Sequence, residues 1–403
     1  MLSSIYFFVF KGNLLIRVVI SIVLAISMAM FFPEISTHFK ILGDLFIQVL
    51  KSIAPILVFV LLIASISGQK TYIQKSIRFI ILLYFLSTFL ASLLSVMMSF
   101  AFPVTLPLSL TNTQNVGLGT VPDVISSLLL GMLENPIKAL YHSNYISILF
   151  WAILIGFGVR SASEMTKVFF QNMSDILSKI VSLAISFAPF GIFGILSSTL
   201  AIEGTESLKL YSQIILLLVV TMMIMAFIIN PLLVYAFNKK NPYPLIWSAV
   251  KTSGITAFFT RSSVANIPVN LKICEELKLD KNVYSVTIPL GATINMAGAA
   301  ITITILTLAT VHTLGEPLYF ITTLLLCFLA SICAAGSSGI AGGSIMLIPV
   351  ACNLFGLSPE ISGMVMGIGF VIGIIQDSME TALNSSSDVV LTATGCSYFD
   401  AKN

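Results

Sequence analysis

Long apolar runs are the feature that most limits what this chain can fold into. A helix needs roughly 20 apolar residues to cross about 30 Å of hydrocarbon. Runs of that order recur near residues 13–33, 41–66, 77–102, 145–160, 180–201, 211–237, 283–311 and 361–391. They predict about eight membrane-spanning helices.

The composition excludes a large soluble protein. Only 9% of the 403 residues are charged, 57% are hydrophobic, and the mean hydropathy is +1.03. Soluble domains usually have about 25% charged residues, and a folded soluble chain must expose much of its surface to water. The short alternating segments of a membrane β-barrel are absent from the sequence. We therefore predict an all-α polytopic membrane protein.

The N-terminal segment could be mistaken for a cleaved signal peptide. Lys11 and Arg17 precede the run "VVISIVLAISMAMFF". This run is long and has no convincing small-x-small cleavage site. It is interpreted as an uncleaved first span.

Several kinds of chemistry have no motif in the sequence. The five cysteines form no CxxC pair, and the three histidines are isolated from one another. HExxH and GxSxG are absent, and "GIAGGS" lacks the lysine and the spacing of a phosphate-binding loop. A net charge of +3 gives no indication of nucleic-acid binding. We expect no enzyme activity, no organic cofactor and no use of nucleotides. Any energy that the protein uses would then come from an ion gradient across the membrane.

Lysine and arginine are concentrated in alternate loops. The loops 103–140 and 202–210 hold only Lys138 and Lys209. Cytoplasmic loops carry the excess of positive charge in membrane proteins, so both termini are predicted to be cytoplasmic. The basic loops contain Lys70, Lys75, Arg78, Arg160, Lys167, Lys179, Lys239, Lys240, Lys251, Lys272, Lys278 and Lys281.

Two further apolar stretches are broken by Gly, Ser and Pro. The stretch 245–271 has basic cytoplasmic loops on both sides, so it is predicted to enter the membrane and return. Its expected tip is "FFTRSSVANIP". The stretch 319–355 contains "CAAGSSGIAGGSIMLIP" and is predicted to be a second hairpin that enters from outside. Irregular backbone at membrane depth is tolerated where protein or a water-filled cavity covers it.

The last 160 or so residues read as two matching units. Each unit is a hairpin followed by a span, and the first span is itself interrupted at "PLGATINMAGAA". Paired interrupted segments in two halves of a chain indicate the midplane binding site of a transporter. The alternative, that Gly and Ser here only serve helix packing, explains one such stretch better than four.

Acidic residues lie on one face of the last span. At 100° per residue, Asp377, Thr381, Asn384 and Asp388 share a stripe about 60° wide, with Glu380 at its shoulder. Carboxylates at membrane depth are costly and usually functional. No Lys or Arg occurs between Lys281 and Lys402, so this block offers them no cationic partner. The expected partner is a cation or an ammonium group that arrives from solution.

Four segments carry a resemblance to a known family. They are "FFTRSSVANIPVN", "PLGATINMAGA", "SSGIAGGSIMLIP" and "QDSMETALNSSSD". In order and spacing they resemble the dicarboxylate/amino acid:cation symporter family, which has the glutamate transporter fold, and within it the bacterial sodium/serine–threonine symporters. The similarity extends over essentially the whole chain.

The resemblance implies a homotrimer of an elevator-type transporter in the bacterial inner membrane. Each protomer would have eight spans and two oppositely inserted hairpins in an inverted repeat. The implied scaffold comprises helices 1–2 (1–76) and helices 4–5. The implied transport domain comprises helix 3 (77–102), helix 6 and a core at 238–403; helices 4–6 lie within 103–237. The core would contain hairpin 1 (245–271), helix 7 (283–311), hairpin 2 (319–355) and helix 8 (361–391).

The resemblance also assigns site residues. Asp377 would bind the substrate's α-ammonium group, Asn384 its carboxylate and Thr381 its side chain, with contacts from the Arg261 carbonyl and Ser263. Ser262, Ile340, Gly343 and Glu380 complete the implied substrate site. One sodium ion would lie between Asp388, the Gly291 backbone, Asn295 and Asn384, and another between hairpin 2 and the turn Thr293–Met296. Tyr84, Ser87 and Thr88 match part of a third sodium site.

Departures from the family pattern bear on the substrate. Members that carry acidic substrates usually have Arg where Glu380 stands, and "NMDGT" where this chain has "NMAGA", with Ala297 and Ala299. A second substrate carboxylate would then lie unpaired in a buried site, which is unfavourable. Serine and threonine are the expected substrates. The alternative is a proton- or sodium-coupled transporter of another small amino acid or a dicarboxylate. A channel or a membrane enzyme fits these motifs less well.

Overall fold

The computed structural model of the chain describes residues 14–67, 75–108, 130–204, 206–337 and 342–400. Within these ranges the secondary structure is helical and contains no strand. The helices are α2 (Leu14–Phe31), α3 (Pro33–His38), α4 (Lys40–Ser67), α5 (Lys75–Ala101), α7 (Pro136–His142), α8 (Tyr145–Arg160), α9 (Glu164–Ser186), α10 (Ala188–Glu203), α11 (Glu206–Ile224), η2 (Met225–Ile229), α12 (Asn230–Asn238), α13 (Tyr243–Ala249), η3 (Val250–Gly254), α14 (Ile255–Thr260), α15 (Ile267–Glu276), α16 (Lys281–Ile294), α17 (Ala297–Leu314), α18 (Phe320–Ala335), η4 (Ile345–Leu347), α19 (Ile348–Leu354) and α20 (Pro359–Asp400).

Six helical segments of the described chain are long and apolar enough to cross a membrane. This agrees with the predicted all-α membrane protein. The segments are Pro33–Ser67, Lys75–Ala101, Glu164–Ser186, Glu206–Asn238, Lys281–Leu314 and Pro359–Phe399.

The run at 180–201 differs from the predicted single span. It is divided between α9 and α10, which meet at Phe187. Pro189 lies in the first turn of α10, and a proline within a helix removes one backbone hydrogen bond and clashes with the carbonyl four residues earlier. The hydropathy pattern located the apolar residues correctly but did not reveal this break.

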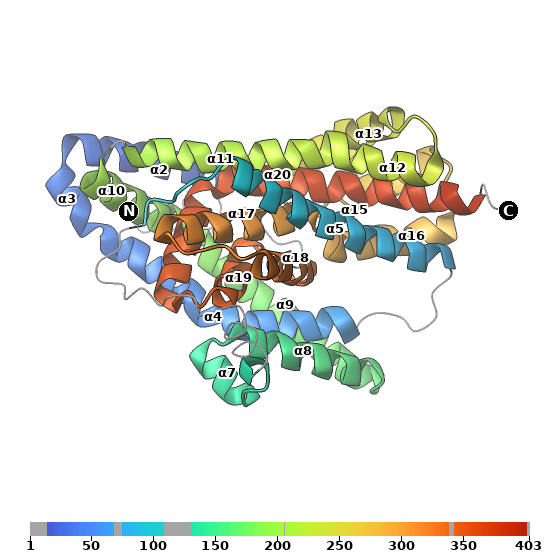
Figure 1. Cartoon of the computed structure of the whole chain (residues 1–403), viewed down its shortest axis with the longest axis horizontal. Coiled ribbons are helices and arrows are strands. Elements are labelled where there is room, and N and C mark those ends of the chain that lie inside the picture. Colours follow the sequence, from blue (N-terminus) through green and yellow to red (C-terminus); the bar gives the residue numbers. More distant parts are fainter. Residues whose placement is uncertain (1–13, 68–74, 109–129, 205, 338–341, 401–403) are drawn as a thin grey trace, which may run out of the picture.

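The C-terminal helices form the centre of the molecule. The apolar window of Lys281–Leu314 is 100% buried and that of Pro359–Phe399 is 83% buried, whereas that of Glu164–Ser186 is only 28% buried. The long helix α20 runs beside α11 and α12 (Figure 1) and also contacts α16 and α17. Polar side chains on α20 are therefore shielded by protein, while α9 presents apolar side chains outward.

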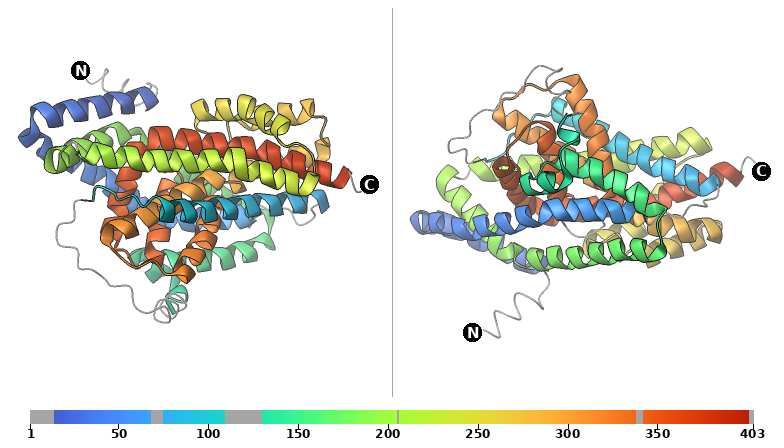
Figure 2. Two further views of the ribbon diagram at one scale, coloured as in Figure 1. Left: turned by 45° about the horizontal axis from the view of Figure 1, so that its top comes forward. Right: turned by 90° about the horizontal axis from the view of Figure 1, so that it is seen from below.

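Two groups of helices can be followed in the packing. The helix α4 packs against α8, α9 and α10, and α10 in turn packs against α2. The helix α5 packs against α16, α17, α18 and α20. Figure 2 gives two further views of these groups. The proposed assignment of 1–76 and 103–237 to scaffold and transport helices remains a prediction.

The first interrupted stretch folds as a hairpin, hereafter hairpin 1, made of α13, η3, α14 and α15. The helical arm ends at Thr260, and Arg261 takes the left-handed conformation with φ 52°. The chain then reverses, so that Asn266 Nδ2 donates to the Ser253 carbonyl at 3.1 Å. The tip lies within the predicted segment 258–268.

The next span is interrupted where the sequence indicated. The helix α16 ends at Ile294, and α17 begins at Ala297. Asn295 and Met296 between them have non-helical backbone angles. The amino end of α17 therefore opens inside the protein, next to α20.

The second interrupted stretch, hereafter hairpin 2, comprises α18, η4 and α19. Its tip includes Gly342, whose φ of +74° is a conformation that glycine adopts readily. Met346 N–H donates to the Gly342 carbonyl at 3.3 Å, which starts the returning arm. Both hairpin tips reach the same stretch of α20.

Candidate functional site

The acidic face of α20 is buried inside the protein. The exposed fractions are 3% for Asp377, 5% for Thr381, 3% for Asn384 and 0% for Asp388. Because the helix is unbroken from Pro359 to Asp400, the predicted stripe is present as one continuous face.

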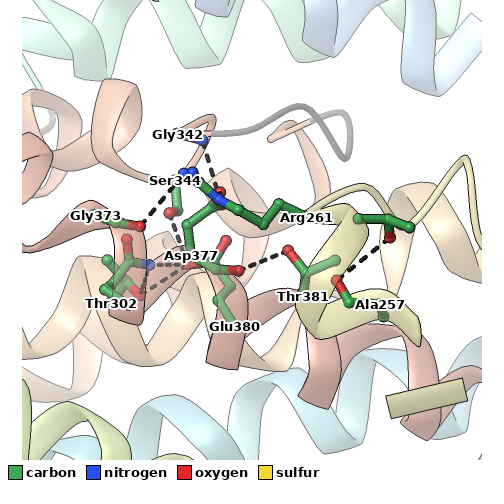
Figure 3. A network of polar contacts seen from close by, with 11 residues as sticks. Ala257, Arg261, Thr302, Gly342, Ser344, Gly373, Asp377, Glu380 and Thr381 are labelled. Atoms are coloured by element: carbon green, nitrogen blue, oxygen red, sulfur yellow. Dashed lines mark hydrogen bonds and ion pairs between the residues drawn. The ribbon is translucent and has the colours of Figure 1, made fainter. Parts of the chain in front are cut away.

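Asp377 is held by both hairpin tips. Arg261 Nε donates to Asp377 Oδ2 at 2.7 Å, and the backbone N–H of Gly342 donates to Oδ1 at 3.3 Å (Figure 3). The guanidinium also donates to the Gly373 carbonyl at 3.4 Å. The expectation that Asp377 would find its positive partner only in an arriving group is wrong. The cation comes from hairpin 1, which the local sequence around Asp377 could not reveal.

Glu380 faces a cluster of neutral donors. Its Oε2 accepts hydrogen bonds from Thr302 Oγ1 at 2.8 Å and from Ser344 Oγ at 2.7 Å (Figure 3). It also accepts a hydrogen bond from Gln376 Nε2. Gly298 lies so close that a Cβ there would be 2.9 Å from the Glu380 backbone. Glu380 thus joins α20 to α17 and to hairpin 2.

Thr381 and Asn384 lie between these acids and the break in the preceding span. Thr381 Oγ1 donates to the Asp377 carbonyl at 2.7 Å. Asn384 Oδ1 accepts from the backbone N–H of Gly298 at 2.7 Å, and its Nδ2 lies 3.3 Å from Met296 Sδ. Asn384 is therefore seated at the amino end of α17, where unpaired backbone N–H groups favour negative charge.

Asp388 and Asn295 form a second polar centre. Asn295 Nδ2 donates to Asp388 Oδ1 at 2.9 Å, while Asp388 Oδ2 and Asn295 Oδ1 are buried without a hydrogen-bond partner. A Cβ at Gly291 would lie 2.6 Å from Asp388 Oδ1, so only glycine allows this approach. These two buried oxygens, one from a carboxylate and one from an amide, lack hydrogen-bond donors and are suitable ligands for a cation.

Tyr84 of α5 lies beside this centre, whereas Ser87 and Thr88 form hydrogen bonds with other groups. The Tyr84 hydroxyl lies 2.8 Å from Thr392 Oγ1 and 3.5 Å from the Asp388 carbonyl. Thr88 Oγ1 donates to the Tyr84 carbonyl at 2.9 Å, and Ser87 Oγ donates to Asn230 Oδ1 at 3.4 Å. Of these three predicted residues, Tyr84 is the one whose side chain touches the Asp388 region.

The other predicted residues fall at the two hairpins and the break. Thr293 Oγ1 donates to the Leu290 carbonyl at 2.8 Å within its own helix, and Met296 is buried. In hairpin 1, Ser262 Oγ accepts from the backbone N–H of Ala265 at 3.2 Å, and Ser263 is buried. Gly343 is buried beside Gly342. Ile340 lies outside the described residues.

A buried amide network that we did not predict fastens hairpin 1 to α20. Asn266 Nδ2 donates to Ser385 Oγ at 2.7 Å and to Ser253 Oγ at 3.0 Å. Asn270 Nδ2 donates to the Ser385 carbonyl at 3.0 Å. The signal was present in the sequence, because Asn266 and Asn270 are one helical turn apart and Ser385 follows Asn384 directly.

Removing the centre of this network should destabilise the protein. Asn266→Ala deletes the donor to Ser385 and Ser253, and loss of a partner from buried polar groups costs about 1–3 kcal/mol. We expect a lower thermal unfolding midpoint in detergent. Asn282→Ala, an exposed amide on α16, is the matched control. An Asn266→Ala midpoint equal to that of the control would contradict the role of the network.

The arrangement suits binding of small ions and zwitterions. Among the described residues no group of three or more His, Cys, Asp or Glu side chains could hold a metal ion. The donors and acceptors instead comprise the carboxylates of Asp377, Glu380 and Asp388, several amides and hydroxyls, and the amino end of α17. Such a mixed set resembles the broken-helix sites in which transporters bind solutes and ions.

A comparison with models of protein families decides between the remaining classes. Residues 14–395 match the model of the sodium:dicarboxylate symporter family. The chain belongs to this family. The match covers both hairpins, the break at Asn295 and the acidic face of α20, so the resemblance noted from the four motifs is confirmed at the level of the family.

Membership in the sodium:dicarboxylate symporter family establishes the general activity. The protein is a multi-pass membrane transporter that couples the movement of sodium to that of a dicarboxylate or amino acid. Members of the family are transporters rather than enzymes, and sodium is cargo that moves with the substrate.

Proposed function

We propose that this symporter imports small neutral amino acids, serine and threonine, together with sodium. The observation that carries the proposal is the state of the charges at the site. Arg261, the cation that contacts Asp377, is already paired with that carboxylate, and Glu380 is a second acid within one helical turn. A substrate's second carboxylate would meet no unpaired positive charge among these contacts, and a buried unpaired charge is strongly unfavourable.

The residues that would bind the substrate have complementary polarity. An α-ammonium group suits Asp377, and an α-carboxylate suits Asn384 beside the amino end of α17. Half-helix amino ends in broken spans point at anionic groups in other transporters. A serine or threonine hydroxyl would then face Thr381, which is already polar.

Sodium has a separate proposed location. Asp388 Oδ2 and Asn295 Oδ1 are the oxygens with unused lone pairs, and the Gly291 backbone lies beside them. A single carboxylate with neutral oxygens matches the charge of one monovalent cation. The site at Tyr84, Ser87 and Thr88 and the site between Thr293, Met296 and hairpin 2 are proposed further sodium positions.

The remaining features are also proposals. They are an elevator movement of the core helices, a homotrimer, cytoplasmic termini and residence in a bacterial inner membrane. Lys239 and Lys240 between α12 and α13, and Lys278 between α15 and α16, support the orientation, whereas Lys167 and Lys179 lie within α9 rather than in the predicted loop. The exposed apolar side chains of α9, among them Val168, Ile176 and Leu183, support a lipid or subunit contact there.

Transport by purified protein in vesicles tests the proposal. We expect labelled serine to accumulate when an inward sodium gradient is imposed, and accumulation to be faster with the interior negative. A neutral substrate carried with Na⁺ moves positive charge inward, and each charge gains about 2.3 kcal/mol per 100 mV. Potassium and valinomycin set the potential at zero or at a negative value.

Competition by unlabelled amino acids gives the control. Threonine should suppress serine uptake, whereas aspartate and glutamate at the same concentration should not. Serine uptake that ignores sodium and follows a proton gradient would refute sodium coupling. Uptake suppressed by aspartate as strongly as by threonine would refute the neutral substrate.

A further inference from the structure

The tip of hairpin 2 is packed against one aromatic ring of α20. Gly342 is buried, and a Cβ there would lie 2.9 Å from Phe370 Cε1. The same glycine has a φ of +74° and donates its N–H to Asp377 Oδ1 at 3.3 Å (Figure 3). The Phe370 ring therefore lies where a side chain of residue 342 would otherwise be.

Phe370 is itself supported by a second ring, which comes from the other group of helices. The ring centroids of Phe370 and Phe46 of α4 are 5.2 Å apart, and the rings meet edge to face at 76°. Both side chains are 6% exposed. Edge-to-face aromatic pairs contribute stability beyond that of the area they bury. Phe46 thus holds in place the ring that supports Gly342.

Phe46 and the hairpin tip are both enclosed by neighbouring helices. Gly191 of α10 lies so close to the Phe46 ring that a Cβ at residue 191 would meet it. A Cβ at Gly342 would also be 3.6 Å from Ile185 Cδ1 of α9. Closely packed interiors have few voids and transmit displacements. The residues Gly191, Phe46, Phe370 and Gly342, hereafter the packing row, therefore connect α10 and α4 with the tip of hairpin 2.

We propose that Phe46 and Phe370 are positioning residues for the substrate site. The packing row holds Gly342 where its N–H reaches Asp377, the carboxylate assigned above to the substrate's ammonium group. Phe46 acts through Phe370, and Phe370 acts through the backbone of Gly342. A fixed donor orients the carboxylate before the substrate binds, and such preorganisation increases affinity. This role rests on the proposed function, because it takes Asp377 as the acceptor for the ammonium group.

Equilibrium binding of labelled serine to the purified protein at saturating sodium tests this role. Phe370→Leu keeps an apolar side chain but removes the ring. We expect the dissociation constant for serine to rise about tenfold, which corresponds to about 1.4 kcal/mol. Phe46→Leu should raise it as well, although α4 carries no residue assigned to the substrate site. The double variant should show less than the sum of the two changes in binding free energy, because both substitutions act through one contact.

A second measurement and a control variant separate positioning from general support of the fold. The sodium concentration that half-saturates serine uptake at saturating serine should stay at its original value, because Asp388 does not belong to the packing row. Phe193→Leu is the matched control, since its ring forms an edge-to-face pair with Phe39 at 5.0 Å between centroids. It should leave the serine dissociation constant unaltered. If a leucine variant does not fold, Phe46→Met and Phe370→Met keep more of the side-chain volume and carry the same test.

Hydrogen–deuterium exchange tests the packing row without reference to the substrate. The backbone amides of residues 342–347 should exchange faster in Phe46→Leu and Phe370→Leu, and at the original rate in Phe193→Leu. Unaltered exchange in both row variants, an unaltered serine dissociation constant in both, or an equal rise in Phe193→Leu would overturn the inference. Faster exchange in the row variants of a protein that binds no serine at saturating sodium would instead overturn the proposed function.

Discussion

Asp388→Asn should raise the half-saturating sodium concentration for serine uptake by at least about tenfold, a change of about 1.4 kcal/mol in binding free energy. The substitution keeps the size of the side chain and an oxygen that can accept from Asn295 Nδ2. It removes the negative charge, and it replaces one carboxylate oxygen by an NH₂ group that cannot coordinate a cation. Serine uptake at very high sodium should recover in large part, because Asp388 does not lie at the Asp377 end of the site.

The matched control for this experiment is Glu360→Gln. Glu360 is a carboxylate in the first turn of the same helix, far along the chain from the Asp388 centre. Its removal should leave the sodium dependence as it is. Full transport with the original sodium dependence in Asp388→Asn would show that the cation binds elsewhere.

Glu380→Arg should reduce serine uptake at least about tenfold and allow uptake of an acidic amino acid, because a guanidinium pairs bidentately with a carboxylate. The present environment of Glu380 supplies donors from Thr302, Ser344 and Gln376. Hydroxyl groups can rotate to become acceptors, and Gln376 Oε1 is a buried acceptor without a partner. An arginine could thus find partners while it places a positive charge near the substrate.

Glu380→Gln separates charge from shape. It retains the size of the side chain and can accept from Ser344, so serine uptake should fall less than in Glu380→Arg, and aspartate should remain a poor substrate. Uptake of labelled serine and uptake of labelled aspartate, each measured in the same vesicles, test both effects. Serine uptake that is unaltered in Glu380→Arg would place residue 380 outside the substrate site.

Much of the fold could be predicted because helix formation in a membrane is a local matter. Every backbone group in lipid must find its hydrogen bond within its own helix, so long apolar runs predict helices without knowledge of their neighbours. The break at Asn295–Met296 and both hairpin tips were also predictable, since they depend on local Gly, Pro and polar residues. The division at Phe187 was missed because hydropathy does not register the effect of Pro189 on the backbone.

The residues that share one face of α20 could be predicted from the sequence, whereas the residues that lie opposite this face could not. The helical period alone brings Asp377, Asn384 and Asp388 to one face, and their burial then follows from their position in an apolar chain. Which residues oppose that face depends on hairpins that lie far away in the sequence. Arg261 is 116 residues from Asp377, and Ser344 approaches Glu380 only when hairpin 2 is folded.

The order of residues alone thus specified a helical membrane protein with an acidic, interrupted core, because hydrophobic length and helical period are properties of single segments. The tertiary structure decided the electrostatics of that core. It brought Arg261 to Asp377, gave Glu380 three neutral donors, and left oxygens of Asp388 and Asn295 without donors. Coulomb and hydrogen-bond energies depend on distances of a few ångströms between separate segments, and only the packing of hairpins 1 and 2 against α20 sets those distances.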